Sequence, residues 1–476
     1  MSTPVVRITN ISIQNFKNVV NGCLSLENTR KDYKASIVGL YGQNGSGKTS
    51  IIEALDLLKH VLCGQSVPAE FADFINVDSE QATLQFDFRI LHSSGPQTVS
   101  YQFCIKSVAD DSNNNSSSPQ PSMKKVIVFN ELLKCPILSD KQIKMGRLID
   151  TNCPDGFSPA PKRKLLSGID KDAETNILVA KKMALLSSRS FIFSKDLLDI
   201  IRKNVRNCRD AGVLSDDLDF YYSLIESLVT FGNSGLFVVR TSHTGIISLN
   251  AQPLMFKYKE GRQGYQGIIM LPLDSPIDFE KQAKEVVEKI IANMNTVLLQ
   301  LIPGLTIGVK DLGPVVLPNG DQGNRIQLVS HRNNKTIPLK YESDGIKKIV
   351  SILQLLIVVY NQPSITVAVD ELDAGVFEYL LGELLRIIAE KGKGQLIFTS
   401  HNLRPLETLD RGFIAFTTTN PAHRYIRMTN VKDSNNLRDF YYRDIMLGEQ
   451  DEELYEPTHN AEIALAFREA GEYSGS

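Results

Sequence analysis

Residues 40–58 read "LYGQNGSGKTSIIEALDLL". Within this stretch Gly42, Gly47, Lys48 and Thr49 satisfy the pattern G-x-x-x-x-G-K-[ST]. In a loop of this kind the backbone N–H groups point inward around an anion, and the lysine reaches the β- and γ-phosphates of a nucleotide. The pattern therefore predicts a phosphate-binding loop.

The residues on both sides of the loop support this prediction. The apolar run 37–41 is typical of a buried strand, and the chain from Thr49 onward is typical of a helix whose N-terminus faces the phosphates. The apolar stripe of this helix is expected to consist of Ile51, Ile52, Leu55, Leu58 and Leu62. The Thr49 hydroxyl is expected to bind Mg²⁺, and Gly45 allows a close approach of backbone to ligand. Asn44 and Ser50 complete the predicted loop.

Composition sets the broad class of protein. The chain has 476 residues, of which 42% are hydrophobic and 22% charged, as in an ordinary soluble protein with room for an α/β core and an insertion. No apolar run is long enough to span a membrane, and the N-terminus lacks a signal-peptide pattern, so a cytoplasmic location is expected. The six cysteines show no metal-binding spacing. A formal charge of −2 gives no general attraction to nucleic acid.

A second stretch, "SITVAVDELDAG" at 364–375, supplies carboxylates. The apolar run after Pro363 predicts a buried parallel strand with Asp370 and Glu371 at its carboxyl end, the edge where α/β sheets bind ligands. Asp370 is expected to hold Mg²⁺, and Glu371 to orient or deprotonate the water that attacks the γ-phosphate. The next predicted strand, "GQLIFTSHN", ends at His401, which could donate a hydrogen bond to a γ-phosphate oxygen.

The order of these motifs resembles the ABC-type ATPase heads of the SMC, Rad50 and RecF kind. More closely, it resembles the AAA15 or OLD-like ATPases of bacterial antiphage systems such as PARIS and Septu. The resemblance rests on "ISIQNFKNV", "GQNGSGKTS", "YESDGIKKIVSIL", "VAVDELDAG", "FTSHN" and "SNNLRDFYYRDIMLGE". It implies an α/β P-loop NTPase fold of the ABC/SMC-head type, with a two-lobed mixed-sheet core and a largely helical insertion.

The resemblance also implies a homodimer, or a higher homo-oligomer, in which two heads sandwich two ATP molecules with Mg²⁺. Ser343 and Gly345 of one chain would close on the γ-phosphate held by Lys48 of the other. Asp373 would occupy the loop that crosses the dimer seam, and Lys17 would approach the α-phosphate.

Two features of the family pattern remain open or differ. The glutamine of the family's lid is not placed, and Gln81 and Gln85 are candidates by position alone. Lys48 and Ser343 are 295 positions apart, much farther than in importer and exporter subunits, so a transporter role is disfavoured.

The chain is expected to divide into four parts. These are an N-terminal ATPase lobe (1–108), an insertion (109–330), a C-terminal ATPase lobe (331–430) and a tail (431–476). In the insertion we expect a mobile hairpin tip at 110–122, a helical module, and a long helix at 276–302 with Ser275 as its N-cap. The basic residues Arg202, Lys203, Arg206 and Arg209 share one helix face, which is more often a solvated face than a binding site.

Three functions remain open at this point. The first is a nucleotide-gated sensor or scaffold in antiphage defence, which holds a separate effector protein and responds to a DNA or phage-protein trigger. The second is a repair or recombination ATPase that clamps duplex DNA, which would need a basic groove. The third is a binding module without turnover, which Glu371 disfavours. The run "RIQLVSH" at 325–331 is interpreted as a structural strand and not as a nuclease site.

Overall fold

The computed structural model describes most of the chain. Described are residues 4–27, 36–92, 95–109, 124–137, 144–152, 165–166, 168, 171–240, 251–260, 263–429, 436–448, 450–456 and 458–472. The predicted hairpin tip at 110–122 lies outside these residues.

Six antiparallel strands form the first sheet, in the order β2-β1-β4-β5-β6-β7. They are β1 (Val5–Phe16), β2 (Val19–Ser25), β4 (Gln81–His92), β5 (Gly95–Ala109), β6 (Lys124–Ile137) and β7 (Lys144–Asp150). On β1 the residues Ile8, Ile11 and Ile13 are fully buried while their neighbours are partly exposed, as expected for a strand with one face on the core.

The second sheet has the order β18-β17-β3-β16-β15-β8 and is parallel except at β18. Its strands are β3 (Ser36–Tyr41), β8 (Leu236–Val239), β15 (Thr366–Val369), β16 (Gln395–Thr399), β17 (Ile414–Thr417) and β18 (Tyr425–Ile426). Every residue of β15 and β16 is buried, which confirms the two strands predicted around the acidic motif. The strand before the phosphate loop and the strand before Asp370 flank β16, so their carboxyl ends meet at one edge.

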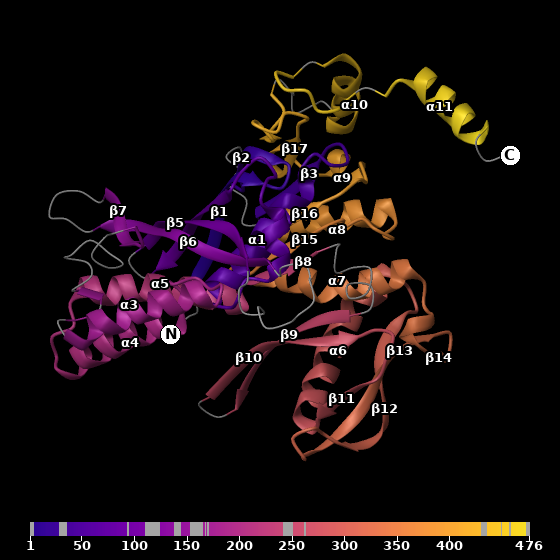
Figure 1. The fold of residues 1–476 in the computed structure, drawn as a ribbon. Coiled ribbons are helices and arrows are strands. Elements are labelled where there is room, and N and C mark those ends of the chain that lie inside the picture. Colours follow the sequence, from indigo (N-terminus) through magenta and orange to yellow (C-terminus); the bar gives the residue numbers. More distant parts are fainter. Residues whose placement is uncertain are drawn as a thin grey trace, which may run out of the picture.

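Helix α1 (Lys48–Leu62) lies between the two sheets (Figure 1). All five residues of its predicted stripe are buried, and Leu57 and Val61 on other faces are buried as well, because the helix is covered from both sides. The side chain of Gln395 joins the sheets directly. It accepts the Ile8 N–H at 2.8 Å and donates to the Ile8 carbonyl at 2.7 Å.

Three helices pack beside the first sheet: α3 (Lys171–Leu186), α4 (Lys195–Asp210) and α5 (Asp216–Ser234). Ser194 and Ser215 cap α4 and α5 by accepting backbone N–H groups. On the basic face of α4, Arg202 pairs with Glu226 at 2.8 Å and Arg209 pairs with Asp219 at 3.2 Å. These pairs agree with the interpretation of this face as a solvated one.

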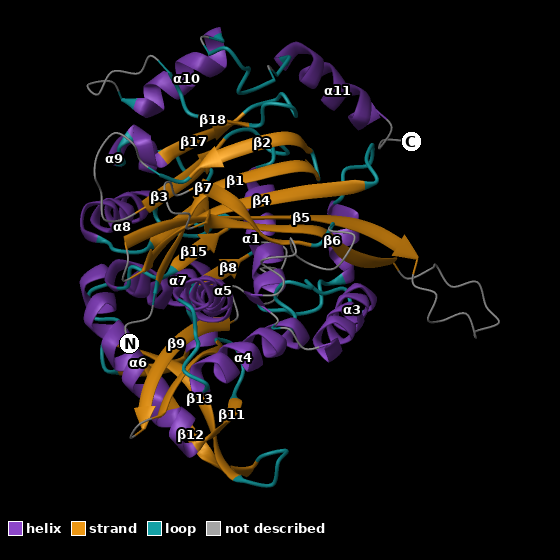
Figure 2. Ribbon diagram, turned by 90° about the vertical axis from the view of Figure 1, so that its left-hand side faces the viewer, coloured by secondary structure: helices purple, strands orange, loops and turns teal. Residues whose placement is uncertain are grey.

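The elements between residues 251 and 338 lie at the opposite end of the molecule from α10 and α11 (Figures 1 and 2) and share a hydrophobic core with α7 and the parallel sheet. They are β9 (Ala251–Glu260), β10 (Gln263–Pro272), β11 (Ile277–Glu280), α6 (Lys281–Leu301), β12 (Thr306–Val316), β13 (Gln322–Arg332) and β14 (Lys335–Pro338). Strand β13 confirms the interpretation of 325–331 as a strand.

The predicted start of the long helix is wrong. Helix α6 begins at Lys281 after Glu280, and Ser275 is not its cap, because residues 277–280 form β11 instead. β11 pairs with β13, and the Asp278 carboxylate accepts two hydrogen bonds from the Arg325 guanidinium, at 2.7 and 2.9 Å. This pairing outweighs the local Ser-Pro signal for a helix start. On α6 the side chains of Val287, Met294 and Leu298 are fully buried.

The remaining helices pack around the parallel sheet or form the C-terminal part of the chain. They are α7 (Asp344–Asn361), α8 (Glu378–Lys391), α9 (Arg404–Thr408), α10 (Leu437–Leu447) and α11 (Asn460–Glu472), with 3-10 turns η1 (Ala69–Phe74), η5 (Leu339–Tyr341) and η6 (Arg411–Phe413). Helices α7 and α8 pack on the face of the parallel sheet opposite α1, whereas α11 projects from the body (Figure 1). In the described part of the chain, no helix has the length and apolar character needed to cross a bilayer.

The sheets cross the predicted division of the chain. β6 and β7 extend the first sheet and β8 forms the edge of the second, although all three lie within residues 109–330. The four-part division stays a prediction. The five described cysteines, Cys23, Cys63, Cys104, Cys135 and Cys208, are free thiols.

Candidate functional site

The phosphate loop connects the end of β3 to the start of α1. Gly47 has a φ of 90° and occupies the N-cap position of α1, where a side chain would be strained. A Cβ at Gly42 would overlap the Thr417 hydroxyl on β17. Gly45, in contrast, faces open space, which leaves the backbone accessible to a ligand. The loop therefore has a fixed backbone with an open side.

Lys48 is the first residue of α1, and its side chain turns back over the loop. Its Nζ donates to the carbonyls of Gly42 at 2.8 Å and Gln43 at 2.9 Å. Burial lowers the pKa of Lys48, and the carboxylates of Asp370 and Glu371 partly oppose this effect. A cation held among backbone carbonyls and facing two carboxylates is suited to exchange these contacts for phosphate oxygens.

Several residues that anchor the loop have no recognisable sequence signal. The Tyr425 hydroxyl donates to the Gly47 carbonyl at 2.8 Å, and the hydroxyls of Thr417 and Ser46 are hydrogen-bonded. Asn18, in the turn between β1 and β2, donates to the Gly45 carbonyl and is near Ser50, whose hydroxyl lies 3.5 Å from the Asn18 side-chain oxygen. Both sheets thus hold the loop.

Asp370 lies at the centre of the carboxylate side of the site and is only 1% exposed. Its Oδ1 accepts the Thr399 hydroxyl at 2.6 Å and the Thr49 hydroxyl at 3.3 Å. The structure therefore brings together Thr49 and Asp370, the two residues predicted to hold Mg²⁺. Thr399, which the sequence reasoning missed, is the last residue of β16.

Glu371 follows Asp370 in a left-handed backbone conformation, with a φ of 47°. Its backbone N–H donates to the Thr399 hydroxyl at 2.7 Å. A non-glycine residue in this conformation costs about 1–3 kcal/mol and is maintained only where its surroundings fix it. Thr399 thus fixes both carboxylate residues, one through its hydroxyl proton and the other through its oxygen.

Asp373 and His401 meet in one loop contact. The Asp373 Oδ2 accepts the backbone N–H groups of His401 at 3.1 Å and Asn402 at 2.9 Å, and the His401 side chain is exposed. The Asp373 Oδ1 is buried and has no hydrogen-bond partner among the described residues. In this structure Asp373 therefore binds the histidine loop of its own chain and keeps one acceptor unused.

The start of α7 lies beside the acidic loop of the same chain. Ser343 caps the helix by accepting the Ile346 N–H at 3.4 Å, and Ser343 is itself exposed. A Cβ at Gly345 would lie 2.5 Å from the Gly375 carbonyl, so only glycine permits this close approach. Lys348, one turn farther along, is 3% exposed, and burial lowers its pKa. Sequence reasoning did not single out Lys348.

Lys17 is engaged in an ion pair behind the loop. Its Nζ lies 2.6 Å from Glu53 of α1 and 4.3 Å from the centre of the Phe74 ring. Arg240, directly after β8, pairs with Asp56 at 3.0 Å and Glu70 at 2.8 Å and lies 3.6 Å from Glu53. This buried cluster connects α1 to the edge strand β8.

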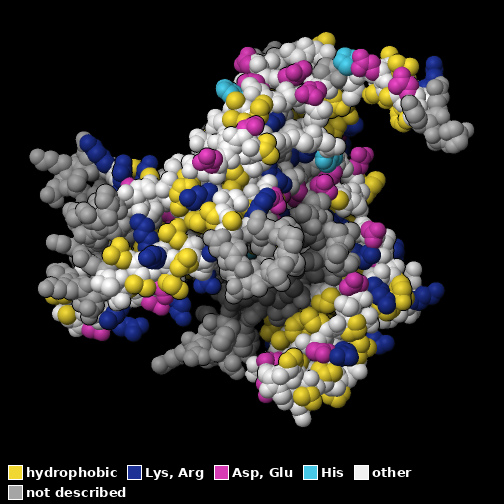
Figure 3. Space-filling model, viewed as in Figure 1, with side chains coloured by type: hydrophobic (Ala, Val, Ile, Leu, Met, Phe, Trp, Pro, Cys, Tyr) yellow, Lys and Arg dark blue, Asp and Glu magenta, His cyan; other side chains and the backbone are white. Residues whose placement is uncertain are grey.

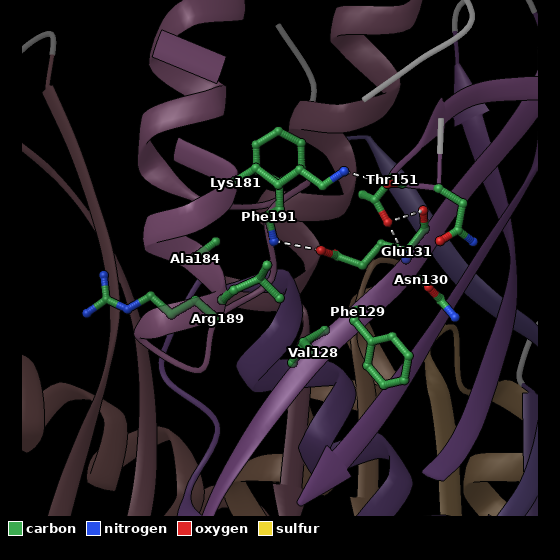
Figure 4. Close-up of a pocket in the computed structure, with 11 residues that line it drawn as sticks. Val128, Phe129, Asn130, Glu131, Thr151, Lys181, Ala184, Arg189 and Phe191 are labelled. Atoms are coloured by element: carbon green, nitrogen blue, oxygen red, sulfur yellow. Dashed lines mark hydrogen bonds between the residues drawn. The ribbon is translucent and has the colours of Figure 1, made fainter. Parts of the chain in front are cut away.

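A cavity of about 120 Å³ lies away from this site, between β6 and α3 (Figure 4). The Glu131 carboxylate beside it accepts the Tyr101 hydroxyl and the Phe191 N–H, both at 2.6 Å. Lys181 donates to the Thr151 carbonyl at 2.5 Å, and Figure 4 shows Arg189 extending away from the cavity. These contacts tie the segment before α4 to the first sheet.

The donor set of the main site fits Mg²⁺ bound together with a nucleotide. Among the described residues, no three His, Cys, Asp or Glu side chains lie close enough to hold a metal ion by themselves. Mg²⁺ characteristically takes one or two carboxylate or hydroxyl ligands and completes its shell with phosphates and water. Thr49 and Asp370 supply such a partial set.

The remaining candidates make other contacts. Arg325 and His331 are six residues apart on β13, which corresponds to roughly 20 Å along a strand. Arg325 pairs with Asp278, and His331 Nδ1 lies 2.8 Å from the Thr336 hydroxyl. Gln81 and Gln85 lie on β4, where the Gln85 amide donates to Asp87 at 3.1 Å.

Comparison with known proteins gives one family match. Residues 37–207 match the model described as "AAA domain, putative AbiEii toxin, Type IV TA system", which covers less than half of the chain. A comparison with curated proteins gave no match.

Among solved structures, the chain is similar to an SMC head bound to the C-winged helix domain of ScpA, with 12% identity and a TM-score of 0.37 over 89% of this chain and 98% of that one. The SMC head domain from Thermotoga maritima gives 12% and 0.36 over 89% and 99%. The recombination mediator protein RecF gives 12% and 0.35 over 89% and 98%. At this level the similarity assigns no function. The phosphate loop on a parallel sheet, packed against an antiparallel sheet, makes the chain an α/β P-loop NTPase by fold.

Proposed function

We propose that this protein binds and hydrolyses ATP with Mg²⁺. The observation that carries the proposal is the convergence of the Thr49 and Thr399 hydroxyls on one oxygen of Asp370, next to the phosphate loop and Lys48. These residues come from α1, β16 and the end of β15, so the fold assembles the site from segments far apart in sequence.

In binding, Lys48 would exchange the carbonyls of Gly42 and Gln43 for phosphate oxygens, while the N–H groups of residues 44–49 surround the phosphates. Thr49 and Asp370 would hold Mg²⁺, which neutralises charge on the phosphates when bound. Gly42, Gly45 and Gly47 would keep the loop open, and Asn44 and Ser50 would border it.

In hydrolysis, Glu371 would accept the proton of the attacking water, and its backbone is held by Thr399 for this task. His401 would donate to a γ-phosphate oxygen as negative charge develops there. The hydrogen bond from the His401 backbone N–H to the Asp373 carboxylate would set the position of the histidine loop.

We further propose that two chains enclose the nucleotides. Ser343 and the N-terminus of α7 are exposed beside the acidic loop, where they could close with Gly345 on the γ-phosphate held by a second chain. Asp373, in the acidic loop, would lie at the seam between the two chains. Lys17 would reach the α-phosphate only by leaving Glu53.

The assembly would act as a nucleotide-gated sensor or scaffold in a cytoplasmic antiphage system of the AAA15/OLD-like type. The motivation for this role is the model matched by residues 37–207, which is described as a putative AbiEii toxin of a type IV toxin–antitoxin system. An effector protein encoded separately would bind the assembly, and a DNA or phage-protein trigger would control it.

Comparison of the wild type with Glu371→Gln tests the proposal. The variant keeps the shape of the side chain but cannot accept the proton, so it should bind ATP, lose at least about a hundredfold in turnover and accumulate as an ATP-bound dimer. Turnover and molecular mass in saturating Mg-ATP are the measurements. Equal turnover, or a monomeric variant under these conditions, would contradict the proposal. Strongly salt-dependent duplex binding by the ATP-bound dimer would favour a DNA clamp over the scaffold role.

A further inference from the structure

Helix α11 is exposed along its whole described length. Its residues Ile463 and Phe467 are 43% and 77% exposed and share one face with Ala470, at helical spacing. Leu465, 54% exposed, lies on the opposite face. Figure 3 shows hydrophobic side chains on this projecting arm.

An isolated helix of this length has only marginal stability in water. Isolated helices shorter than about 12–15 residues gain too little to offset the cost of nucleation, and α11 has 13 residues. Most helical stability in proteins comes from packing of an apolar face. The apolar face of α11 therefore calls for a surface that the described single chain does not provide.

The segment that leads to α11 is tied to the phosphate loop. Leu454 is buried, the Glu453 carbonyl accepts the Thr419 N–H at 2.8 Å, and the Glu456 N–H donates to the Gln43 side chain at 3.0 Å. Gln43 is the second residue of the loop. Asn460 is four positions after Glu456 in the sequence, a span of at most about 14 Å. Helix α11 therefore starts close to the nucleotide edge.

Exposed aromatic side chains lie near Ser343 and the start of α7, the part of the chain that would close on the nucleotide of a second copy. Tyr341, Phe377 and Tyr379 are 69%, 71% and 56% exposed. The contact between Gly345 and Gly375 brings the segments of these residues together at the start of α7. We call these three residues the aromatic surface. Exposed aromatic residues are enriched at protein interfaces.

We propose that α11 of one chain packs its Ile463/Phe467 face on the aromatic surface of a second copy when the two heads close on ATP. The inference rests on the proposed sandwich, which places the phosphate loop of one chain against Ser343 of the other. That arrangement brings the Gln43-bound segment of one copy beside the aromatic surface of its partner.

The first test measures dimerisation of the Glu371→Gln protein in saturating Mg-ATP. Adding Ile463→Asp and Phe467→Asp should weaken the dimer by at least about tenfold, because two apolar contacts are replaced by charges. Leu465→Asp is the matched control, since it places the same charge on the opposite face of α11 and should leave the dimer unchanged. Binding of a fluorescent ATP analogue to dilute monomer should be equal in all variants.

The outcomes separate the two proposals. If Glu371→Gln with native α11 stays monomeric, the ATP sandwich itself fails. If it dimerises and the Ile463→Asp/Phe467→Asp variant dimerises as tightly as the Leu465→Asp control, the role of α11 is overturned.

Disulfide crosslinking gives an independent measurement. In a Cys23→Ser chain, Phe467→Cys mixed with Phe377→Cys should form an ATP-dependent crosslink between chains. A crosslink within one chain that carries both changes, at high dilution, would show that α11 folds back on itself and would refute the proposal.

Discussion

Thr399 holds two functional residues at once. Its hydroxyl donates to the Asp370 carboxylate at 2.6 Å and accepts the Glu371 N–H at 2.7 Å, and the side chain is fully buried. Because Glu371 has a left-handed backbone, loss of this acceptor would release a strained residue. The position of the proposed base therefore depends on a residue that would not itself touch the nucleotide.

We expect Thr399→Val to lower the ATPase kcat by about 10- to 100-fold, the range typical when a residue that orients metal ligands is lost. Binding of a fluorescent ATP analogue should change much less, because Lys48 and the loop amides are intact. Thr399→Ser keeps the hydroxyl and should retain most of the activity. Steady-state turnover and nucleotide titration measure the two quantities. An equal loss in Thr399→Ser, or unchanged turnover in Thr399→Val, would argue against this role.

Glu131 is a fully buried carboxyl group whose pKa is raised by burial, although the Ser190 and Tyr101 hydroxyls and the Phe191 N–H partly oppose the shift. The folded protein therefore binds this proton more tightly than the unfolded chain does. The resulting stability is present below the ordinary glutamate pKa of about 4.3 and is lost as the pH rises through the raised folded value.

The difference in unfolding free energy between the wild type and Glu131→Gln should therefore decrease as the pH rises from about 4.5, by at most about 1.4 kcal/mol per pH unit. Glutamine does not titrate, so its lost hydrogen bonds add a constant offset. Urea denaturation at several pH values gives the slope. A rising difference would show that the folded state lowers the pKa of Glu131.

At the scale of elements, α1 is held to β8 by a buried charge cluster. Arg240 is 4% exposed and contacts Glu53, Asp56 and Glu70. Arg240→Met would leave Glu53 and Asp56 without this cation in a buried site, which typically costs about 3–5 kcal/mol. The control is Arg209→Ala, which removes the exposed pair with Asp219 and should cost less than about 1 kcal/mol. Chemical denaturation of both variants checks the prediction, and equal losses would contradict it.

Some of these elements could be predicted from the sequence, and others could not. The phosphate loop, its helix and the strand before Asp370 depend on local patterns, and all three are confirmed as elements. The start of the long helix depended on pairing with β13, which lies far along the chain and leaves no local signal. The contact between Tyr425 and Gly47 likewise joins distant residues. Motifs thus located the site, whereas tertiary contacts determine which side chains support it.

At the scale of the whole molecule, a single chain contains both halves of the proposed sandwich but presents them separately. Lys48 lies at the carboxyl edge of the parallel sheet, and Ser343 is exposed at the start of α7. If each nucleotide is enclosed by Lys48 of one chain and Ser343 of another, a dimer has two composite sites. Substitutions in the two halves can then be placed in the same site or in different sites.

Mixing two inactive variants tests this arrangement. Lys48→Ala should abolish ATP binding because the phosphates lose their cation, and Ser343→Arg should block closure because a large side chain replaces the cap. In a mixed dimer both changes fall in one site, and the other site has native Lys48 and native Ser343. Random pairing makes half of the dimers mixed, so an equal mixture should regain up to about a quarter of wild-type turnover. Each variant alone, at the same total concentration, is the control. Turnover that remains absent in the mixture, although both variants are folded and Ser343→Arg binds ATP, would show that Lys48 and Ser343 do not serve a shared site across two chains.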